Sequence, residues 1–281
     1  MMKTFETKFE GSDGTPFYVR GWEPEATPKA VVALVHGLGE HVGRYAHVGQ
    51  ALTDAGYVLI GFDTRGHGKS GGARGHFPSL DTIMDDVRQF LQFVSQRYSN
   101  LPQFLYGHSL GGLLSLTYAV QNKNAGFKGV ITTGAALRSP LQEQKVKVTM
   151  AKVLGTLMPA VTIPSGLDAN TISRDKAVVD KYVNDPLVHD KTSLGLGKSA
   201  ITAINVCFAG ANGFSYPLLI MHGRDDKLTF ASGSEDFARL ASQSNKDVTL
   251  KVWDGLYHEI HNEPEQGEVF KVMVEWLDKH L

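Results

Sequence analysis

The sequence holds a single cysteine, Cys207, among its 281 residues. One cysteine cannot form a disulfide within the chain, so cysteine usage gives no reason to expect an oxidising compartment, and we expect a cytoplasmic protein. We find no segment with the roughly 20 consecutive apolar residues that a membrane-spanning helix needs. Residues 1–9 alternate charged and apolar side chains and lack the apolar core of a secretory signal. We therefore expect neither export by this segment nor a spanning anchor.

An excess of charge of either sign is lacking as well. The chain has 28 Lys and Arg against 29 Asp and Glu, a net charge of -1. Such a balance produces no field that would attract nucleic acid. The segment Gly71–Gly75 comes nearest to an RNA-binding tract, but it is too short, and we interpret it as a loop. The composition therefore predicts no nucleic-acid partner.

Motifs for metals and nucleotides are missing too. Residues Asp63–Ser70 are rich in glycine, yet they lack the spacing of a P-loop. The segment His258-Glu259-Ile260-His261 falls one residue short of the zinc motif H-E-x-x-H, and no other cluster has zinc-ligand spacing. We predict no metal and no cofactor.

What the sequence does contain is an alternation of short apolar runs and amphipathic segments. Two alternating runs on either side of the turn Gly11–Gly14 predict an antiparallel hairpin. The expected strands are Thr4–Glu10, Pro16–Trp22, Ala30–Val35, Tyr57–Phe62, Gln103–Tyr106, Gly129–Thr133, Leu218–Met221 and Val248–Trp253. The expected helices are Arg44–Ala55, Asp81–Tyr98, Ser109–Gln121, Ser234–Ser242 and Glu265–His280. This order predicts an α/β fold, with a mostly parallel central sheet and helices on both faces.

The alternation stops between residues 138 and 214. One side of an expected helix there carries the apolar residues Met150, Val153, Leu154, Leu157 and Met158, and two prolines and the glycine-rich residues 194–197 follow. We interpret residues 138–214 as a cap subdomain inserted over the carboxyl edge of the sheet, with residues 1–137 and 215–281 forming the core. Two interpretations of the apolar stripe stay open: it packs on the sheet, or it faces lipid or an acyl chain.

The segment Gly107–Gly111 has the pattern G-x-S-x-G, between an apolar strand-like run and a helix-like one. A serine hydroxyl is a weak nucleophile, so it must stand on a sharp strand-to-helix turn, within reach of a base and of backbone donors. In a chain with 30 glycines the alternative is an ordinary glycine-rich turn. The order of strand, turn and helix favours Ser109 as a nucleophile.

The base is expected near the end of the chain. In α/β-hydrolases with this elbow the catalytic residues follow the order Ser, acid, His. Three histidines, His258, His261 and His280, follow the last candidate acid. His280 is the penultimate residue, where fraying would spoil its geometry. His258 comes soonest after the strand ending near Trp253, so we favour it as the base and expect His261 beside the pocket.

The acid is expected on the loop after Leu218–Met221, where Asp225 and Asp226 are adjacent. Only one of them can orient His258 and stabilise its protonated form, and order and spacing leave both open.

A site for the developing oxyanion is expected after the strand Ala30–Val35, at His36-Gly37-Leu38-Gly39. Folds of this kind use one backbone N–H from that loop and another from the residue after the serine. We therefore expect the amides of Leu38 and Leu110 to be the donors, although a plain strand-end turn is the alternative for the loop.

Several segments together resemble the monoacylglycerol lipases of the serine α/β-hydrolase superfamily. In order along the chain they are His36–Tyr45, Gly66–Ser70, the serine elbow and Tyr257–His261, joined within the insertion by Ile172–Arg174, Tyr182 and Asp185–Leu187. The similarity extends over nearly the whole chain and implies an α/β-hydrolase fold with an inserted cap. It also implies Ser109, Asp226 and His258 as nucleophile, acid and base, with Leu38 and Leu110 at the oxyanion.

The resemblance further implies a polar end of the pocket. Glu40, Arg44, Tyr182 and His261 match positions that surround the glycerol hydroxyls, which is chemically sensible because a buried diol needs several hydrogen-bond partners. For each of these residues the alternative is a structural ion pair or a position at the rim.

The expected function is hydrolysis of a monoacylglycerol to glycerol and a fatty acid through an acyl-serine. The expected partner is a single-chain lipid ester, with transient contact of the cap with a membrane surface as a hypothesis. A lysophospholipase or a broad carboxylesterase is the enzymatic alternative, since the same triad serves any ester. A non-catalytic receptor that only binds a ligand is the alternative from another class.

Overall fold

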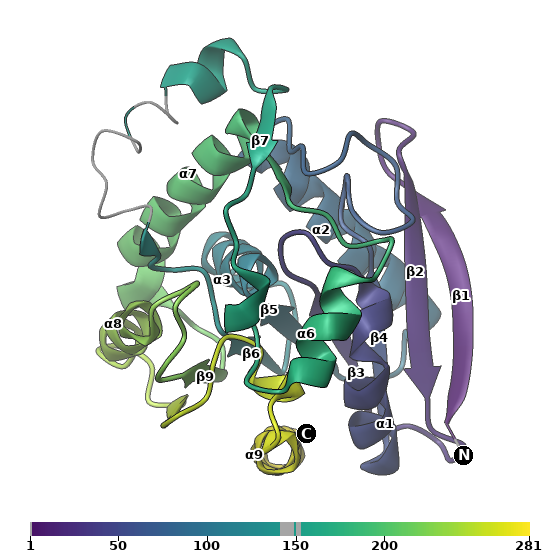
Figure 1. Ribbon diagram of the computed structural model, residues 1–281. Helices are drawn as coiled ribbons and strands as arrows, with labels where there is room; N and C mark the ends of the chain where they lie inside the picture. Colours follow the sequence, from purple (N-terminus) through teal and green to yellow (C-terminus); the bar gives the residue numbers. More distant parts are fainter. Residues whose placement is uncertain (1, 141–148, 150–152) are drawn as a thin grey trace.

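An eight-stranded sheet forms the centre of the molecule (Figure 1). The computed structural model describes residues 2–140, 149 and 153–281. The strands are β1 (Lys3–Glu10), β2 (Pro16–Glu23), β3 (Ala30–Val35), β4 (Tyr57–Phe62), β5 (Gln103–His108), β6 (Gly129–Thr133), β9 (Leu218–Gly223) and β10 (Val248–Trp253). Their spatial order is β1-β2-β4-β3-β5-β6-β9-β10. The hairpin β1–β2 and the pair β2–β4 are antiparallel and the other neighbours are parallel, so the predicted mostly parallel sheet is confirmed.

Helices cover both faces of this sheet. One face packs against α1 (Ala46–Asp54) and α9 (Gln266–Lys279), and the other against α2 (Leu80–Arg97), α3 (Leu110–Gln121), α7 (Leu194–Gly210) and α8 (Ala231–Ala241). Successive side chains of a strand point to opposite faces. In β3, Val31 and Ala33 therefore enter the α2–α3 layer, while Val32 and Leu34 enter the α1–α9 layer. All four are fully buried, which explains the continuous apolar run in the sequence.

The helices predicted in the core are all present, with small shifts at their ends. The longest of them, α2, begins after Ser79, whose hydroxyl accepts a hydrogen bond from the amide of Thr82 at 3.1 Å. The helix predicted from residue 44 starts instead as a 3-10 turn, Val42–Tyr45, which leads into α1.

The chain between β6 and β9 adds smaller elements on the same side of the molecule as α7. They are the antiparallel pair β7 (Thr162–Pro164) and β8 (Lys191–Ser193), and the helix α6 (Lys176–Val183). The segment from β7 to α6 passes in front of α3 and β5 in Figure 1. Of the predicted apolar stripe, Met150 lies outside the described residues, Leu154 is half-buried, and Val153, Leu157 and Met158 are exposed. The division into a core and a cap at residues 138 and 214 stays a prediction.

The glycine-rich residues 194–197 do not interrupt regular structure, because α7 begins there. The Ser193 hydroxyl accepts a hydrogen bond from the amide of Leu196 at 3.0 Å and caps the helix. A side chain at Gly195 would lie within 3.0 Å of the carbonyl oxygens of Phe77 and Pro159. Close packing of the first turn therefore explains a glycine that the sequence pattern alone suggests is a helix breaker.

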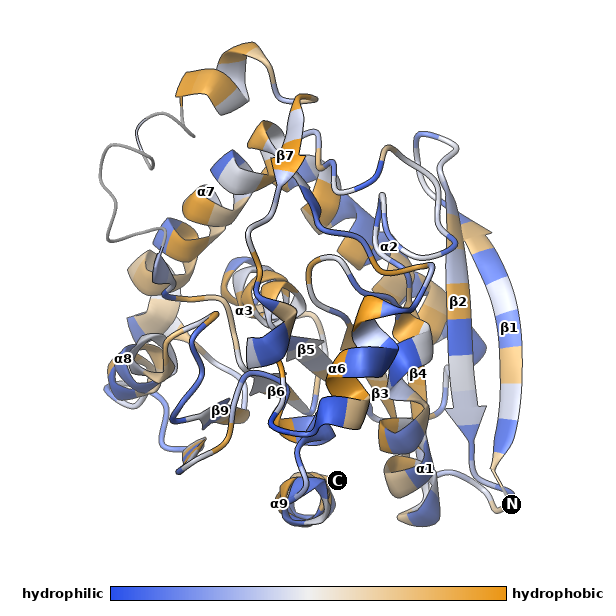
Figure 2. Ribbon diagram, in the orientation of Figure 1, coloured by the Kyte–Doolittle hydropathy of each residue, from blue (hydrophilic) through white to orange (hydrophobic). Residues whose placement is uncertain are grey.

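The expectation that no segment reaches membrane-spanning length was wrong, because residues 194–213 are by length and composition able to cross a membrane. Hydrophobic residues recur along this helix in Figure 2. One side of it packs against α3, where the Thr117 hydroxyl lies 3.2 Å from the Cys207 sulfur. Core helices meet the same criteria of length and composition, so this segment alone does not indicate a membrane protein.

Candidate active site

Ser109 stands on the turn between β5, which ends at His108, and α3, which begins at Leu110. Its backbone has φ 54° and ψ -119°, and it is the one non-glycine residue with positive φ in the described part of the chain. Two backbone hydrogen bonds hold it there, from the Ser109 amide to the carbonyl of Thr133 and from the amide of Ala136 to the Ser109 carbonyl, each 3.0 Å long. A strained backbone that its neighbours enforce is typical of functional sites.

The strain at Ser109 predicts a difference between two variants. Ser109→Gly should be more stable than Ser109→Ala by about 1 kcal/mol, because glycine adopts positive φ without the clash of a Cβ atom, although it loses more chain entropy. For a chain of this size the difference corresponds to about 2 °C in Tm, measured by thermal unfolding. A glycine variant that melts below the alanine variant would contradict the assigned strain.

The glycines of the elbow let the turn pack against the sheet. A side chain at Gly111 would lie within 3.0 Å of the backbone oxygens of Val35 and His36, and one at Gly107 would meet the backbone of Gly111 itself. Backbone atoms cannot swing aside as the end of a side chain can. Gly111 is therefore required by the close approach of α3 to the end of β3, and Gly107 by the close approach of α3 to β5.

Gly111→Ala should consequently destabilise the protein by about 3 kcal/mol or more. Gly197→Ala is the matched control, because Gly197 also lies in a helix but a Cβ atom there meets nothing within 4 Å. The control should gain up to about 1 kcal/mol from helix propensity. Denaturant unfolding of both variants measures the two values, and equal effects would contradict the close packing at Gly111.

The structure brings Ser109, His258 and Asp226 together. His258 Nε2 lies 2.9 Å from Ser109 Oγ, and His258 Nδ1 lies 2.7 Å from Asp226 Oδ2. With Asp226 ionised, Nδ1 carries the proton and donates to the carboxylate, which leaves Nε2 to accept from the serine hydroxyl. Three residues far apart in the sequence thus form one hydrogen-bonded chain, in the arrangement of a serine hydrolase triad.

Burial and charge set the protonation of the acid and the base. Burial pushes the pKa of Asp226 upward, but the charge of His258 and hydrogen bonds from His222 and His258 outweigh it, so this pKa lies well below 3.8. Burial lowers the pKa of His258, and the neighbouring Asp226 carboxylate more than compensates, so the pKa of His258 lies above 6.5. The pair is therefore poised as a carboxylate and a base whose affinity for a proton the carboxylate increases.

The two adjacent aspartates, which sequence order left open, are in different environments. Asp225 is exposed, whereas Asp226 is only 5% exposed. The Oδ1 atom of Asp226 accepts hydrogen bonds from the amides of Leu228 at 2.8 Å and Thr229 at 2.9 Å. Its Oδ2 atom faces His258. Only Asp226 is placed to orient the base, in agreement with the resemblance.

The loop after β3 lies against the serine. A Cβ atom on Gly37 would lie 3.1 Å from the Cβ atom of Ser109, so this backbone borders the reacting hydroxyl. Leu38 and Leu110 both lie beside Ser109, and the amide of Leu110 opens α3, where the first N–H groups have no partner within the helix. The position agrees with the predicted oxyanion site, and the donor roles stay a prediction.

The segment after α6 is tied to this same loop. The amide of His189 donates to the carbonyl of Gly39 at 2.9 Å, and a side chain on Gly39 would collide with the His189 carbonyl. Close by, His41 Nε2 lies 2.9 Å from Asp185 Oδ2. Gly39 has φ 75°, which favours glycine. The segment after α6 and the loop that carries Leu38 therefore share a backbone hydrogen bond and a side-chain hydrogen bond.

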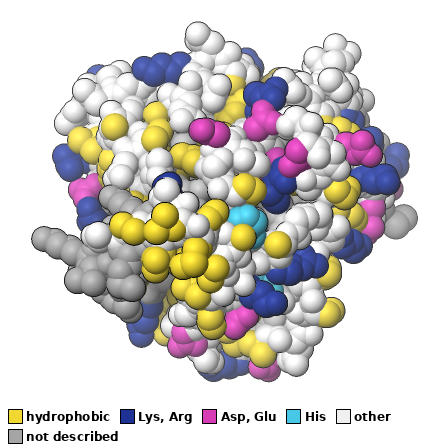
Figure 3. Space-filling view, turned by 90° about the horizontal axis from the view of Figure 1, so that it is seen from above, with side chains coloured by type: hydrophobic (Ala, Val, Ile, Leu, Met, Phe, Trp, Pro, Cys, Tyr) yellow, Lys and Arg dark blue, Asp and Glu magenta, His cyan; other side chains and the backbone are white. Residues whose placement is uncertain are grey.

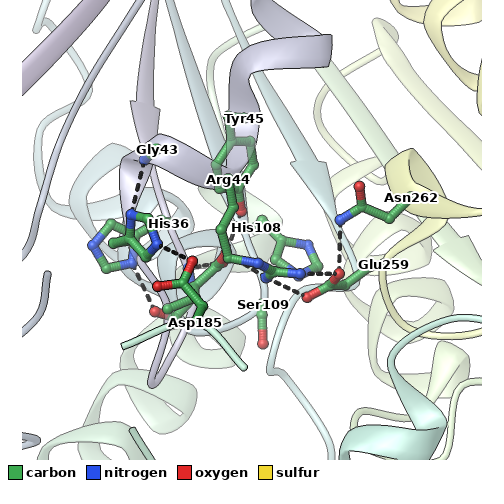
Figure 4. Close-up of polar contacts among 12 residues, drawn as sticks. His36, Gly43, Arg44, Tyr45, His108, Ser109, Asp185, Glu259 and Asn262 are labelled. Carbon is green, nitrogen blue, oxygen red and sulfur yellow. Dashed lines mark hydrogen bonds and ion pairs between the residues drawn. The ribbon is translucent and has the colours of Figure 1, made fainter. Parts of the chain in front are cut away.

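Arg44 bridges two buried carboxylates beside Ser109 (Figure 4). It donates to Glu40 Oε2 at 2.8 Å and, through two nitrogens, to both oxygens of Glu259 at 2.7 Å. Burial raises the pKa of Glu40, Arg44 opposes it, and the charge of Glu259 adds to the rise. Burial acts the same way on Glu259, but the charge and hydrogen bonds of Arg44 dominate and lower its pKa to about 2. The sequence analysis did not single out Glu259, although it directly follows His258.

Glu40 is also used within the loop after β3. Its Oε1 atom accepts from the Gly37 amide at 2.7 Å and from the Tyr45 hydroxyl at 2.8 Å. Because both oxygens are already bonded, Glu40 has a structural role as well as any role in binding. The two interpretations left open for this residue are therefore compatible.

Tyr182 and His261 lie on opposite sides of the Arg44 network. The guanidinium of Arg44 sits over the Tyr182 ring, 4.7 Å from its centroid, and burial, with Glu40 and Glu259, raises the pKa of Tyr182 to about 12. His261 stacks on Tyr45 with ring centroids 5.1 Å apart, and its buried Nδ1 atom has no partner in the described structure. Burial and the neighbouring histidines hold the pKa of His261 well below 6.5, so this ring is neutral.

A small cavity lies at Ser109, with room of about 20 Å³. Its polar lining includes Glu40, Tyr182 and Glu259, and Leu167, Ile172 and Leu228 close its apolar side. This is space for about one water molecule, so an acyl chain enters only when the apolar wall moves. Within the described ranges no three His, Cys, Asp or Glu side chains gather to hold a metal ion.

Comparison with known proteins places the chain among hydrolases. The family described as "Serine aminopeptidase, S33" matches residues 26–265. The chain belongs to this family. It is 37% identical over 278 residues to a monoacylglycerol lipase of Mycolicibacterium smegmatis, covering 98% of each chain. It is 34% identical to the crystal structure of the monoacylglycerol lipase of Paleococcus ferrophilus, covering 99% of this chain and 100% of that one, with a TM-score of 0.83.

A third relative is much longer. The chain is 39% identical over 270 residues to an uncharacterized abhydrolase domain-containing protein of Dictyostelium discoideum. The match covers 96% of this chain but 28% of that protein, so the chain spans little more than a quarter of this relative's length. Family and relatives together identify the chain as an α/β-hydrolase and a carboxylic ester hydrolase, which confirms the expected fold and enzyme class.

Proposed function

We propose that this protein cleaves the ester bond of monoacylglycerols through an acyl enzyme on Ser109. The observation that carries the proposal is the chain of short hydrogen bonds from Ser109 through His258 to Asp226. It lies beside the loop that holds Leu38 and the start of α3 at Leu110, the two residues whose amides we expect at the oxyanion. The relatives that are named monoacylglycerol lipases supply the substrate class.

The geometry supports a two-step reaction. His258 Nε2 takes the proton of Ser109 as Oγ attacks the ester carbonyl, and the two amides stabilise the oxyanion. The protonated His258 then gives its proton to the glycerol oxygen, the ester bond breaks, and the acyl group stays on Ser109. In the second step His258 deprotonates a water, which attacks the acyl-serine and releases the fatty acid. Asp226 holds the histidine tautomer and stabilises the imidazolium, without taking the proton.

The charges beside Ser109 favour a neutral head group over a phosphodiester. Arg44 is the cation that a phosphate would need, yet it is bonded to both Glu40 and Glu259. With both carboxylates ionised the cluster has a net charge of -1, and with Glu40 protonated it is neutral, so it is not an anion site in either state. Hydroxyls of glycerol can instead share hydrogen bonds with these groups. This argues against the lysophospholipase alternative.

Substrate preference tests the proposal. A long-chain monoacylglycerol, the lysophosphatidylcholine with the same acyl chain, and a short nitrophenyl ester are compared by kcat/KM. We expect kcat/KM for the monoacylglycerol to exceed that for the lysophospholipid by about 100-fold. The negative phosphate would find no free cation in the acidic cluster and would be repelled by its carboxylates. A preference for the lysophospholipid would defeat the monoacylglycerol assignment, and a preference for the short ester would favour a broad carboxylesterase.

We further propose that the enzyme takes its lipid from a membrane surface through exposed apolar residues of the segment between β6 and α7. Those exposed there are Val153, Leu157, Met158, Val161, Ile163, Leu167 and Val183. Figure 3 shows hydrophobic side chains gathered on this face of the molecule. Leu167 also lines the cavity at Ser109, so the patch adjoins the site that the acyl chain must reach. Apolar side chains in this number suit insertion into the boundary between head groups and acyl chains.

Co-sedimentation with phosphatidylcholine vesicles at low salt tests this contact. The wild type should bind, and a Leu157→Asp, Val161→Asp double variant should lose most of the bound fraction. Leu250→Asp is the matched control, because Leu250 is also exposed (39%) but lies on β10. Absence of wild-type binding, or an equal loss in the control, would remove the proposal of membrane contact without touching the ester hydrolysis.

A further inference from the structure

Asp226 is approached by two histidines. Besides His258, the buried His222 at the end of β9 places its Nε2 atom 3.0 Å from Asp226 Oδ2, the same oxygen that His258 contacts. The Nδ1 atom of His222 lies 2.8 Å from the hydroxyl of Ser234, at the start of α8. His222 and Ser234 are both fully buried. On either side of the carboxylate, therefore, an imidazole connects Asp226 to a serine hydroxyl.

The neighbours of His222 fix which of its nitrogens carries the proton. The Nε2 atom faces two acceptors, the Asp226 carboxylate at 3.0 Å and the Thr229 carbonyl at 2.9 Å. A lone pair there would be repelled by both, so Nε2 carries the hydrogen. The Nδ1 atom is then an acceptor, and the Ser234 hydroxyl donates to it. Ser234 thereby holds His222 in the tautomer that donates to Asp226.

A third donor completes the environment of the Oδ2 atom. The Thr229 hydroxyl lies 2.8 Å from Asp226 Oδ2 and 3.0 Å from the Gly134 carbonyl oxygen. Its single hydrogen is shared between these two acceptors. The His222 N–H group points to the carboxylate from a fully buried position and does not line the cavity at Ser109. His222 therefore acts on the reaction through its neighbours: Asp226, and Thr229, whose hydroxyl lies 3.3 Å from His222 Nε2 and 3.2 Å from His258 Nδ1.

We propose that His222, held in its tautomer by Ser234, is a positioning residue that fixes the Asp226 carboxylate against His258. The inference rests on the proposed roles of Asp226 and His258 and adds to them a support behind the acid. Without the His222 donor, Oδ2 has more freedom to turn away from His258, so fewer molecules have the base aligned at any moment. A carboxylate that accepts fewer hydrogen bonds also keeps more of its negative charge, so it attracts the proton on His258 more strongly.

The stronger attraction of Asp226 for the proton on His258 predicts the direction in which the pKa of His258 changes, and this direction can be tested. Loss of the His222 donor should raise the pKa of His258, and the acid limb of the kcat/KM profile should move to higher pH. Loss of the Asp226 charge should move the same limb to lower pH, because that charge is what raises the pKa of His258. The other charged groups that face His258, namely Glu259 and Glu40, are unchanged in either variant, and so is the neighbouring ring of His108, whose pKa burial lowers to about 3.

Three variants test the proposal, with monoacylglycerol hydrolysis measured across pH. His222→Leu should lower kcat about 10- to 100-fold with little change in KM, and should shift the acid limb upward. His222→Gln keeps an N–H donor near the Nε2 position and should recover most of kcat and the wild-type limb. Ser234→Ala, which frees the tautomer of His222, should shift the limb in the same upward direction with a smaller loss of kcat.

The outcomes separate this inference from the proposed function. If His222→Leu and Ser234→Ala both fold but keep the wild-type kcat and pH profile, while Asp226→Asn loses most of its kcat, His222 has no positioning role. If His222→Leu does not fold, the comparison of Ser234→Ala with the wild type tests the positioning role. An acid limb of the kcat/KM profile that does not shift in Ser234→Ala overturns the proposal. An acid limb that moves to lower pH in either variant would also overturn it. Activity retained in Asp226→Asn would instead overturn the proposed function.

Discussion

Replacement of Ser109 by alanine should lower kcat for ester hydrolysis by about 10⁶-fold. In the proposed reaction this hydroxyl forms the acyl enzyme, and in the described part of the chain no other serine takes part in the contacts of His258. The remaining rate should be the small acceleration that backbone amides and substrate binding supply without a nucleophile. Steady-state kinetics with a monoacylglycerol measures the loss, and circular dichroism confirms that the variant is folded.

Labelling with a fluorophosphonate probe supplies the control for this prediction. The wild type should be labelled and Ser109→Ala should not, since the probe reacts with an activated serine. Labelling that persists in the variant would place the nucleophile elsewhere. A folded wild type that is never labelled would favour the alternative of a non-catalytic receptor.

Replacement of Asp226 by asparagine should lower kcat by about 10⁴-fold while the fold is retained. An amide at this position donates where the carboxylate accepts, so it favours the tautomer of His258 in which Nε2 carries the proton and cannot take one from Ser109. The charge that raises the pKa of His258 above 6.5 is lost as well, so the acid limb of the remaining activity should move to lower pH.

Asp225→Asn is the matched control for this change. It is the same substitution one residue earlier, at an exposed side chain, and it should leave kcat close to that of the wild type. A large loss of kcat in Asp225→Asn, or a small loss in Asp226→Asn, would show that Asp226 is not the catalytic acid. The pair therefore tests the choice between two neighbours that sequence order alone left open.

The parts of the fold that could be predicted are those with a strong local pattern. Fully apolar runs such as Ala30–Val35 form central parallel strands. The segment around Phe90, in which apolar residues recur every three or four positions, forms α2. The elbow could be predicted because its constraint is local too: a glycine on each side of Ser109 allows a turn that few other sequences permit.

The parts that could not be predicted depend on partners distant in the sequence. Whether Asp225 or Asp226 turns inward is decided by amides of the following loop and by His258, not by spacing. His222 directly follows the expected strand Leu218–Met221, and its contact with Asp226 exists only once the loop folds back. In the same way, a glycine is needed at position 195 because the backbone of Phe77, far away along the chain, leaves no room for a side chain.

The hydrogen bond between the His189 amide and the Gly39 carbonyl joins the segment after α6 to the loop beside Ser109. A displacement of the segment around His189 therefore pulls on the loop that carries Leu38, whose amide we predict as an oxyanion donor. If that donor role holds, we expect substitutions near Asp185 and His189 to change turnover as well as affinity.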